Sequence, residues 1–522
     1  MKPARTCACV LLAIWLIAIG WPEAARESPP NGTVAGLSTI WNLNDGVVRD
    51  GNGDGLADMV AARIVMPATA TVREIQGASN IAARLGFETT ALTMPFVGRD
   101  GEQPPAGALP ILIGGENAVV KRLVDSGRID LQKLTKGQGL IAAVPSPFGA
   151  TGIGLVVAGR DDQGTLAAAN VLAGRLPRLW NMSGITIPTL EDHVARYLRS
   201  REVEVGRPAL TEILVDSDRR GLAAAHVRVP VAAAVASRAA KAIEDLDAAH
   251  RRGLEPGTLN FSEIASLVLE WDNGNGIASR STVRRAGFNS RTLSPPIDPD
   301  ELAPDSPGDR GRAAQPARAP AKPYDLVNAF SIEGWFGDSF TDLIPDRTET
   351  SVVLGGASDS LGAVHIAARL GLESTGVTFP IAQADHEVRE FAREPSPILI
   401  GRDNTLTTEL VKIGRVHLED LRPGEGAVQI VPRAFGSATA AVVAGADAAG
   451  TDAAALYLAR RAPYVWDNRR GAPTLSDVRS EISKFLKGAS GAGQAGQALR
   501  EIDSVVDGPG QGDRVIRSEA LP

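Results

Sequence analysis

Cysteine is nearly absent from this chain of 522 residues, which has only Cys7 and Cys9. Both lie in "CACVLLAIWLIAIGW" (7–21), a short apolar run behind two basic residues, which is typical of an export signal. Cleavage of a signal peptide over residues 1–25 leaves no cysteine, which excludes disulfides, thiolate catalysis and cysteine-bound zinc. We expect a periplasmic or secreted protein that reaches the membrane only through this segment, if the segment stays uncleaved.

An excess of basic residues is missing as well. The chain has 54 Lys and Arg against 61 Asp and Glu, a net charge of -7, and the two signs are interspersed. A nucleic-acid partner usually requires a basic stripe, so we expect none. Aromatic residues make up 4% of the chain, which leaves few rings for stacking on sugars. With 44% hydrophobic and 22% charged residues, the composition is that of a globular protein of about two to four domains.

The common catalytic signatures are also absent from the sequence. It has no P-loop, no Gly-x-Ser-x-Gly elbow and no His-Glu-x-x-His motif. The six histidines lack the spacing of metal ligands, and the pattern around His193, beside Asp192, indicates a solvated helical residue. These observations leave both an enzyme and a non-catalytic chain open, and they favour the second.

The sequence does contain an internal duplication. Four stretches return: "IAARLGFETT" (81–90) as "IAARLGLEST" (366–375), "LPILIGGEN" (109–117) as "SPILIGRDN" (396–404), "GQGLIAAVPSPFG" (137–149) as "GEGAVQIVPRAFG" (424–436), and 155–180 as 441–466. Shared composition does not produce agreement of this length. We therefore predict two copies of one domain, at 37–200 and 325–488.

Each copy predicts an α/β fold. Short apolar runs such as "PILIGG" (110–115) and "GIGLVVAG" (152–159) indicate strands, and they alternate with helical stretches such as "DQGTLAAANVLAGRL" (162–176). Strands that alternate with helices of this length favour a mainly parallel sheet covered on both faces. The overall prediction is two such domains flanking a smaller module.

The other segments differ in composition. Residues 201–293 hold an Ala-rich helix and a hairpin signal, "DNGNG" (272–276), which predict a small α+β module. Residues 294–323 are Pro-rich and predict a linker. Residues 489–522 are Gly/Ala-rich and predict a flexible tail with one helix, over 495–508.

One loop of the first copy has the spacing of a calcium site. In "RDGNGDGLADMV" (49–60), the oxygen-bearing side chains of Asp50, Asn52, Asp54 and Asp58 stand at calcium-loop positions. The loop resembles the Asp-rich loops of dockerin and thrombospondin type 3 repeats, which implies bound calcium. The competing interpretation, which the sequence favours, is an Asx-rich turn ahead of a strand.

The second copy keeps only part of that pattern. Asp338, Asp342 and Asp346 align with the three aspartates, but Phe340 replaces the asparagine and cannot bind a cation. Both copies also place a glycine directly after a strand, at Gly114 and its equivalent in the second copy. Such a glycine either lets a ligand approach the sheet or permits the turn into the next helix, and the second is favoured.

A family resemblance rests on "AGRDDQGTL" (158–166), preceded by "ILIGG" (111–115) and "GQGLIAAV" (137–144). These stretches resemble the α/β accessory domain that precedes the catalytic barrel of β-hexosaminidases and α-glucuronidases. Their order is also similar to the flavodoxin-like domains of the periplasmic cellulose synthase regulatory subunit. The resemblance implies a non-catalytic domain, so no catalytic residues carry over. The second copy reads "AGADAAGT" (444–451), without the arginine, which puts a shared ligand role for Arg160 in doubt.

Three functions stay open on these grounds. The first is an exported, non-catalytic protein that binds or organises a polysaccharide or a cell-envelope complex. The second is a carbohydrate-active enzyme with a site between the repeats, using the aspartates of the two loops. The third is a calcium-dependent structural or adhesion protein. For sugar contact, Trp41, Trp271 and Trp335 are the candidates, whereas Trp180 and Trp466 stand at equivalent places and are expected to pack.

Overall fold

The structure is a computed structural model. It describes residues 36–145, 147–148, 152–174, 187–218, 222–251, 264–272, 278–284, 324, 326, 328–388, 396–436, 438–461, 501–506 and 513–519. The predicted signal peptide (1–25), the whole Pro-rich linker (294–323), and Trp180 and Trp466 lie outside these residues.

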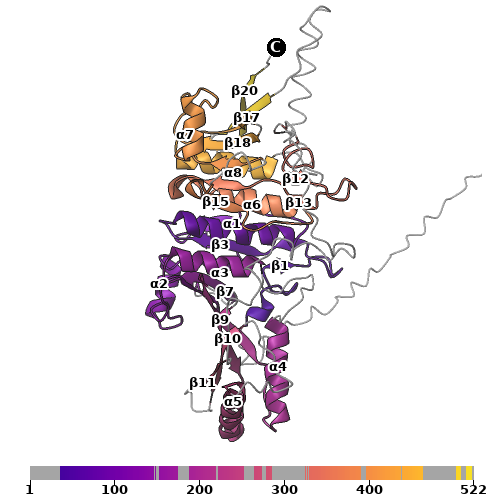
Figure 1. The fold of residues 1–522 in the computed structure, drawn as a ribbon, viewed down its shortest axis with the longest axis vertical. Helices are drawn as coiled ribbons and strands as arrows, with labels where there is room; N and C mark the ends of the chain where they lie inside the picture. Colours follow the sequence, from indigo (N-terminus) through magenta and orange to yellow (C-terminus); the bar gives the residue numbers. More distant parts are fainter. Residues whose placement is uncertain are drawn as a thin grey trace, which may run out of the picture. The chain divides into compact units, whose positions relative to one another are not determined.

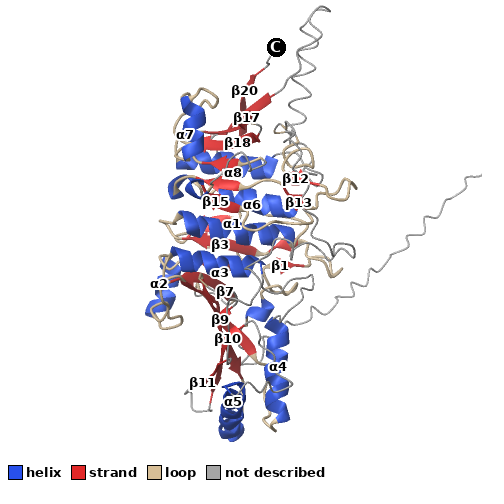
Figure 2. Cartoon of the chain, in the orientation of Figure 1, coloured by secondary structure: helices blue, strands red, loops and turns tan. Residues whose placement is uncertain are grey.

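Repeat 1 folds around a mainly parallel sheet (Figures 1 and 2). In spatial order its strands are β4 (Val97–Arg99), β3 (Ala62–Met66), β5 (Leu109–Ile113), β7 (Ile153–Gly159) and β6 (Gln138–Pro145). Only β6 runs antiparallel to its neighbour in this set. Both faces of the central strands are buried, which explains why their sequences are continuously apolar. The predicted α/β fold is confirmed.

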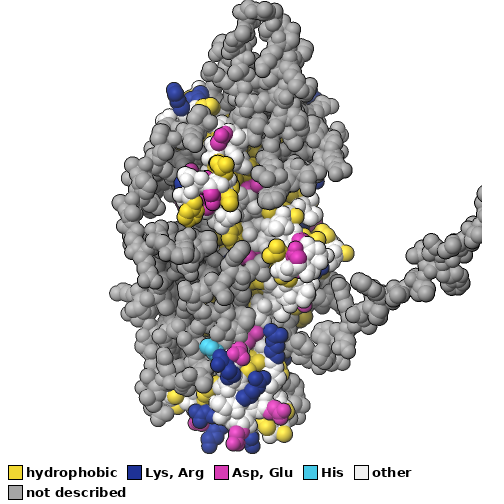
Figure 3. Space-filling model, turned by 90° about the vertical axis from the view of Figure 1, so that its right-hand side faces the viewer, with side chains coloured by type: hydrophobic (Ala, Val, Ile, Leu, Met, Phe, Trp, Pro, Cys, Tyr) yellow, Lys and Arg dark blue, Asp and Glu magenta, His cyan; other side chains and the backbone are white. Residues whose placement is uncertain are grey.

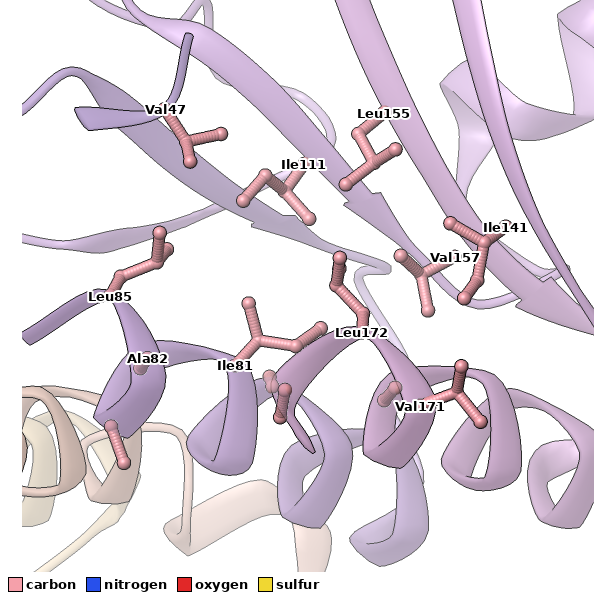
Figure 4. Packing of buried hydrophobic residues seen from close by; sticks show 14 of the residues in the cluster. Val47, Ile81, Ala82, Leu85, Ile111, Ile141, Leu155, Val157, Val171 and Leu172 are labelled. Carbon is pink, nitrogen blue, oxygen red and sulfur yellow. The ribbon is translucent and has the colours of Figure 1, made fainter. Parts of the chain in front are cut away.

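Three helices cover the two faces of this sheet. They are α1 (Val72–Phe87) and α3 (Asp162–Gly174) on one face and α2 (Ala118–Asp125) on the other. Figure 4 shows Ile81 of α1 and Leu172 of α3 pointing toward Ile111 and Leu155 of the sheet. Because successive strand residues face opposite sides, Leu112 packs in the second cluster, with α2.

Repeat 2 has the same strand order. Its strands are β15 (Ala382–Ala384), β14 (Val352–Leu354), β16 (Ile398–Ile400), β18 (Ala438–Gly445) and β17 (Gly426–Phe435), and its helices are α6 (Ala363–Leu372), α7 (Thr405–Lys412) and α8 (Ala448–Arg461). Again only β17 of this set is antiparallel to its neighbour. The two repeats therefore place equivalent residues at equivalent points.

Residues 201–293 extend the sheet of repeat 1. After α4 (Ile187–Ser200) come β8 (Ala209–Asp216), β9 (Leu222–Val229), α5 (Ala236–Arg251), β10 (Ile264–Asp272) and β11 (Ala278–Arg284). Strand β8 pairs with β6, so one nine-stranded sheet runs from β11 to β4. The segment predicted as a separate α+β module thus shares a sheet with repeat 1. Strands β10 and β11 form the predicted antiparallel pair, and its turn lies outside the described residues.

The tail contributes strands. Residues 501–506 form β19 (Glu501–Val506), which pairs with β17, and β20 (Asp513–Glu519) pairs with β19. The predicted helix over 495–508 is therefore wrong for residues 501–506. The β-branched residues Ile502, Val505 and Val506 suit a strand, and the open edge of β17 supplies hydrogen bonds that the sequence does not reveal.

Short elements complete the described chain. They are η1 (Leu37–Thr39), β1 (Val48–Arg49), β2 (Met59–Val60), η2 (Ala233–Val235), β12 (Phe336–Gly337), β13 (Arg347–Thr348), η5 (Ala357–Asp359) and η6 (Asp385–Glu387). Strands β1 and β2 pair around the loop 50–58, and β12 and β13 pair around the loop 338–346. Among the described residues, no helix has both the length and the apolar character that crossing a membrane requires.

Candidate functional site

The first loop, residues 50–58, brings the four predicted calcium ligands together. The Asp50 carboxylate accepts hydrogen bonds from the amides of Asn52 (3.1 Å), Gly53 (2.5 Å) and Gly55 (2.7 Å). These amides, that of Gly55 above all, lower the pKa of Asp50. Residues 51–56 are exposed to solvent, whereas Asp50 and Asp58 are half-buried. Hydrogen bonds to the loop's own backbone therefore help to fix its shape.

Asp54 and Asp58 also accept hydrogen bonds from backbone amides of their own loop. Asp58 accepts the amides of Gly51 (2.7 Å) and Asn52 (3.1 Å), and Asp54 accepts the amide of Leu56 (2.8 Å). These are the bonds of an Asx-rich turn, and the turn leads directly into β2. In the part of the chain that the structure describes, no group of three or more acidic or histidine side chains is arranged to hold a metal ion. Calcium binding stays a prediction.

The second loop, residues 338–346, repeats this scaffold. Asp338 accepts the amides of Asp342 (3.2 Å) and Leu343 (2.8 Å), and Asp346 accepts the amide of Ser339 (2.7 Å). Asp342 accepts the amide of Ile344 at 3.0 Å. The aspartates that an enzyme with a site between the repeats would use are thus engaged with the backbones of their own loops.

The two loops differ where the backbone turns left-handed. Repeat 1 has glycines there, Gly53 (φ +83°) and Gly55 (φ +87°), whereas repeat 2 has Thr341 (φ +56°) and Leu343 (φ +69°). A side chain in this conformation crowds the backbone and costs about 1–2 kcal/mol. Strain of this kind concentrates at functional sites. Repeat 2 therefore carries backbone strain at two positions where glycine avoids that strain in repeat 1.

Both loops expose large apolar side chains. The exposed fractions are 61% for Leu56 and 43% for Met59 near loop 1, and 62% for Phe340, 77% for Leu343 and 50% for Ile344 in loop 2. Among the described residues, the one further large apolar side chain with comparable exposure is Ile413. Strands β1 and β12 lie on the right of Figure 1, the side that faces the viewer in Figure 3, where hydrophobic and acidic side chains occur together.

Helices α1 and α6 join the two repeats through small residues. A Cβ added to Gly86 would lie 3.0 Å from the carbonyl carbon of Ala368, and one added to Gly371 would lie 2.8 Å from that of Ala83. The contacts are reciprocal because these positions are equivalent in the two copies. Where these two helices meet, their backbones pack directly against each other.

Two polar contacts across this junction are reciprocal as well. Asn80 accepts the amide of Ile381 at 3.0 Å, and His365, which stands at the position equivalent to Asn80, accepts the amide of Phe96 at 3.3 Å. Burial, with Arg63 and Arg460 nearby, lowers the pKa of His365 to about 3, so the ring is neutral and its Nδ1 is free to accept. Each repeat thereby satisfies one buried amide of the other.

The tryptophans proposed for sugar contact are buried, which corrects that interpretation. Trp41 is 7% exposed, Trp271 5% and Trp335 0%. The guanidinium of Arg84 lies 4.7 Å from the centre of the Trp41 ring and pairs with Glu88 at 2.5 Å. All three rings belong to the hydrophobic core, and the Trp41 ring also covers the buried Arg84–Glu88 ion pair. The sequence alone does not distinguish a core tryptophan from a binding one.

The carboxyl ends of the parallel strands, where α/β folds commonly bind ligands, are occupied by side chains of the protein. In repeat 1 the buried Glu74 accepts the amide of Thr71 at 2.8 Å and lies against Gly114 (φ +84°). In repeat 2 Asp359 accepts the amide of Arg402 at 3.3 Å. Glu74 thus caps the start of its own helix, whereas Asp359 binds the loop that follows β16, and the left-handed conformation of Gly114 is that of a turn residue.

One titratable cluster was not predicted from the sequence. On neighbouring strands, Glu212 Oε1 lies 3.1 Å from His226 Nδ1, the Arg280 guanidinium lies 3.3 Å from His226 Nε2, and Arg280 Nε lies 3.4 Å from Glu270. Burial, with Glu270 nearby, raises the pKa of Glu212 to about 7, and burial, with Arg280, lowers that of His226 to about 4. The four residues are far apart in sequence, so only the strand register reveals them.

His193 also differs from its prediction as a solvated residue. It lies on α4 with a half-buried side chain, and its Nδ1 is buried without a hydrogen-bond partner among the described contacts. The prediction missed this burial because an i-to-i+4 pattern does not show which neighbouring segments cover the helix.

Comparison with known protein families gives a match in repeat 2. Residues 367–461 match the S-layer like family, outer domain. No curated protein matches the chain. The matched segment runs from within α6 to the end of α8, and repeat 1 has the same order of elements between residues 82 and 174. The match associates the chain with the cell envelope.

Proposed function

We propose that this chain is an exported, non-catalytic protein that binds or organises a polysaccharide or a protein complex of the cell envelope. The match of residues 367–461 to the S-layer like family, outer domain, is the observation that carries the proposal. The resemblance to accessory domains of glycosidases, which are not catalytic, points the same way. The location we propose is the periplasm or the exterior, after removal of residues 1–25.

The arrangement of the repeats supports a binding role. The reciprocal bonds of Asn80 and His365 fix one repeat against the other, and each repeat presents an exposed loop with apolar and acidic side chains. The aspartates of these loops accept backbone amides, which is a scaffold and not an arrangement of a catalytic acid and base.

The test is retention of the chain, residues 26–522, on isolated cell envelopes and on a panel of soluble and insoluble polysaccharides. Retention on one glycan would identify a carbohydrate partner, and retention on envelopes alone would identify a protein complex. No retention on either would refute the proposal. Release of reducing sugar with a sharp pH optimum, lost on changing Asp58 or Asp346, would instead establish the enzyme alternative.

We also propose calcium binding by Asp50, Asn52, Asp54 and Asp58. The observation in its favour is that the four side chains share one exposed loop whose glycines take left-handed conformations. Calorimetric titration with calcium should give one site, and Asp58→Asn should weaken it at least tenfold while Asp346→Asn leaves it unchanged. Heat of binding equal in both variants would refute this site. Retention on envelopes measured with and without chelator separates calcium binding from the main function.

A further inference from the structure

The apolar side chains of the two loops are only partly covered by the fold itself. Leu343 is 77% exposed although its backbone is left-handed, and Phe340 and Ile344 beside it are 62% and 50% exposed. A glycine at position 343 would relieve the strain, as Gly55 does in repeat 1. A strained leucine held in water is explained by a contact outside the chain.

The loops are held in shape before any partner arrives. The carboxylates of Asp338 and Asp346 accept backbone amides within loop 2, and Asp50 and Asp58 do so in loop 1. A binding surface that is ordered in advance loses less conformational freedom when its partner binds. The apolar side chains are therefore presented at fixed positions.

The charge around these side chains selects the partner. Each loop carries three aspartates, one exposed and two half-buried, and the nearby Arg49 and Arg347 are engaged with Gly107 and Glu349. The surface is thus apolar and acidic together. An anionic bilayer would be repelled by these carboxylates, whereas a segment with both basic and apolar side chains complements them.

We propose that loops 50–59 and 338–346 form a docking surface for a cationic, amphipathic segment of a partner protein. Leu56, Met59, Phe340, Leu343 and Ile344 supply the apolar contacts, and the aspartates supply the charge. The inference rests on the proposed function, because it names the kind of envelope component that is bound. It assigns the partner to protein rather than to polysaccharide.

The probe is an 18-residue amphipathic peptide of leucine and lysine, with fluorescence anisotropy measured against the chain, residues 26–522. We expect binding that weakens at least tenfold in the triple variant Phe340→Ser, Leu343→Gly, Ile344→Ser, and that weakens as salt rises from about 50 to 500 mM. Ile413→Ser, which removes a similarly exposed side chain elsewhere, should leave binding unchanged. All four side chains are exposed, so these variants should fold, which circular dichroism checks.

Several outcomes would overturn the inference. If a glycine–lysine peptide of equal charge binds with the same affinity, the apolar side chains do not contribute to binding. Binding of anionic vesicles that is lost in the triple variant would assign the surface to lipid, and sedimentation showing self-association lost in the same variant would assign it to a second copy. Retention of the triple variant on envelopes at the level of the unaltered chain would refute the docking surface while leaving the proposed function intact. Absence of retention for the unaltered chain would refute the proposed function itself.

Discussion

The junction of the repeats predicts an unusual response to added methyl groups. In an ordinary helix, replacing glycine by alanine stabilises the folded protein by about 1 kcal/mol. At Gly86 the added Cβ would lie 3.0 Å from both the Ala368 carbonyl carbon and the Leu372 nitrogen, and closer still to the Ala368 oxygen. These are backbone atoms of a helix and do not move aside singly. The helices must separate to admit the methyl group.

Overpacking against rigid neighbours costs about 1–3 kcal/mol, which exceeds the gain in helix propensity. We therefore expect Gly86→Ala and Gly371→Ala each to lower the free energy of unfolding by roughly 1–2 kcal/mol. Once the helices have moved apart for one methyl group, the second meets less resistance. The double variant should consequently lose less than the sum of the single changes.

Urea denaturation followed by circular dichroism measures these changes, and hydrogen exchange of α1 and α6 locates them. Gly101→Ala is the matched control, because its added Cβ meets nothing within 4 Å. Stabilisation by both junction variants would refute the argument that α1 and α6 are packed backbone to backbone. Strict additivity in the double variant would refute the idea that the helices separate as a unit.

Three further predictions concern buried polar groups. Asn80→Ala and His365→Ala each leave a buried amide without an acceptor, so each should lower the free energy of unfolding by about 1–3 kcal/mol in urea denaturation, and equal stability to the unaltered chain would contradict the contacts. Arg369→Met, which leaves Glu373 buried, should cost about 3–5 kcal/mol, more than changing an exposed arginine. Because the pKa of Glu212 is raised to about 7 in the folded chain, its contribution to stability is present in acid and is lost as pH rises from about 4.5 to 7. The pKa of His226 is lowered to about 4, so its contribution is present above about pH 6.5 and is lost as pH falls toward 4. Thermal melts of His226→Gln should therefore show stability falling as pH rises from 4.5 to 7, and a flat profile would refute the burial of Glu212.

The α/β fold could be predicted because its signals are local. Strands buried on both faces are continuously apolar, as in residues 109–113 and 153–159, and the helices between them carry their own caps. Asn117, for example, caps α2 by accepting the amides of Val119 and Val120. The second occurrence of each pattern in repeat 2 made the succession of strands and helices along the chain visible twice.

Pairings between distant segments could not be predicted in this way. Whether β8 closes a new sheet or joins β6 depends on an open edge that no local pattern encodes, and the same holds for β19 against β17. The burial of Trp41 is a second example. Arg84 and its partner Glu88 lie at the end of one helix, but the Trp41 ring that packs on Arg84 comes from a different segment.

Calcium binding by the first loop stays a prediction, and the structure adds a feature of both loops that the sequence analysis did not single out. The sequence directs attention to the oxygens of Asp50 and Asp58, which the structure shows accepting amides of their own loop. Large apolar side chains also face solvent in these loops, and of these Leu343 replaces the glycine of repeat 1. In an alignment of the copies, that replacement looks like the loss of a calcium loop. In the folded chain it is a gain of exposed apolar surface.

The junction and the loops have a common physical basis. Duplication gives each repeat one loop, but two loops act as one surface only if the repeats cannot turn against each other. Small residues let α1 and α6 approach closely, and the reciprocal acceptance of one amide by Asn80 and another by His365 sets their register. A rotation of one repeat would break both bonds at once, because each joins a helix of one copy to a loop of the other. The α1–α6 junction therefore fixes the distance between the two loops. Binding of a partner that contacts both loops should depend on that junction.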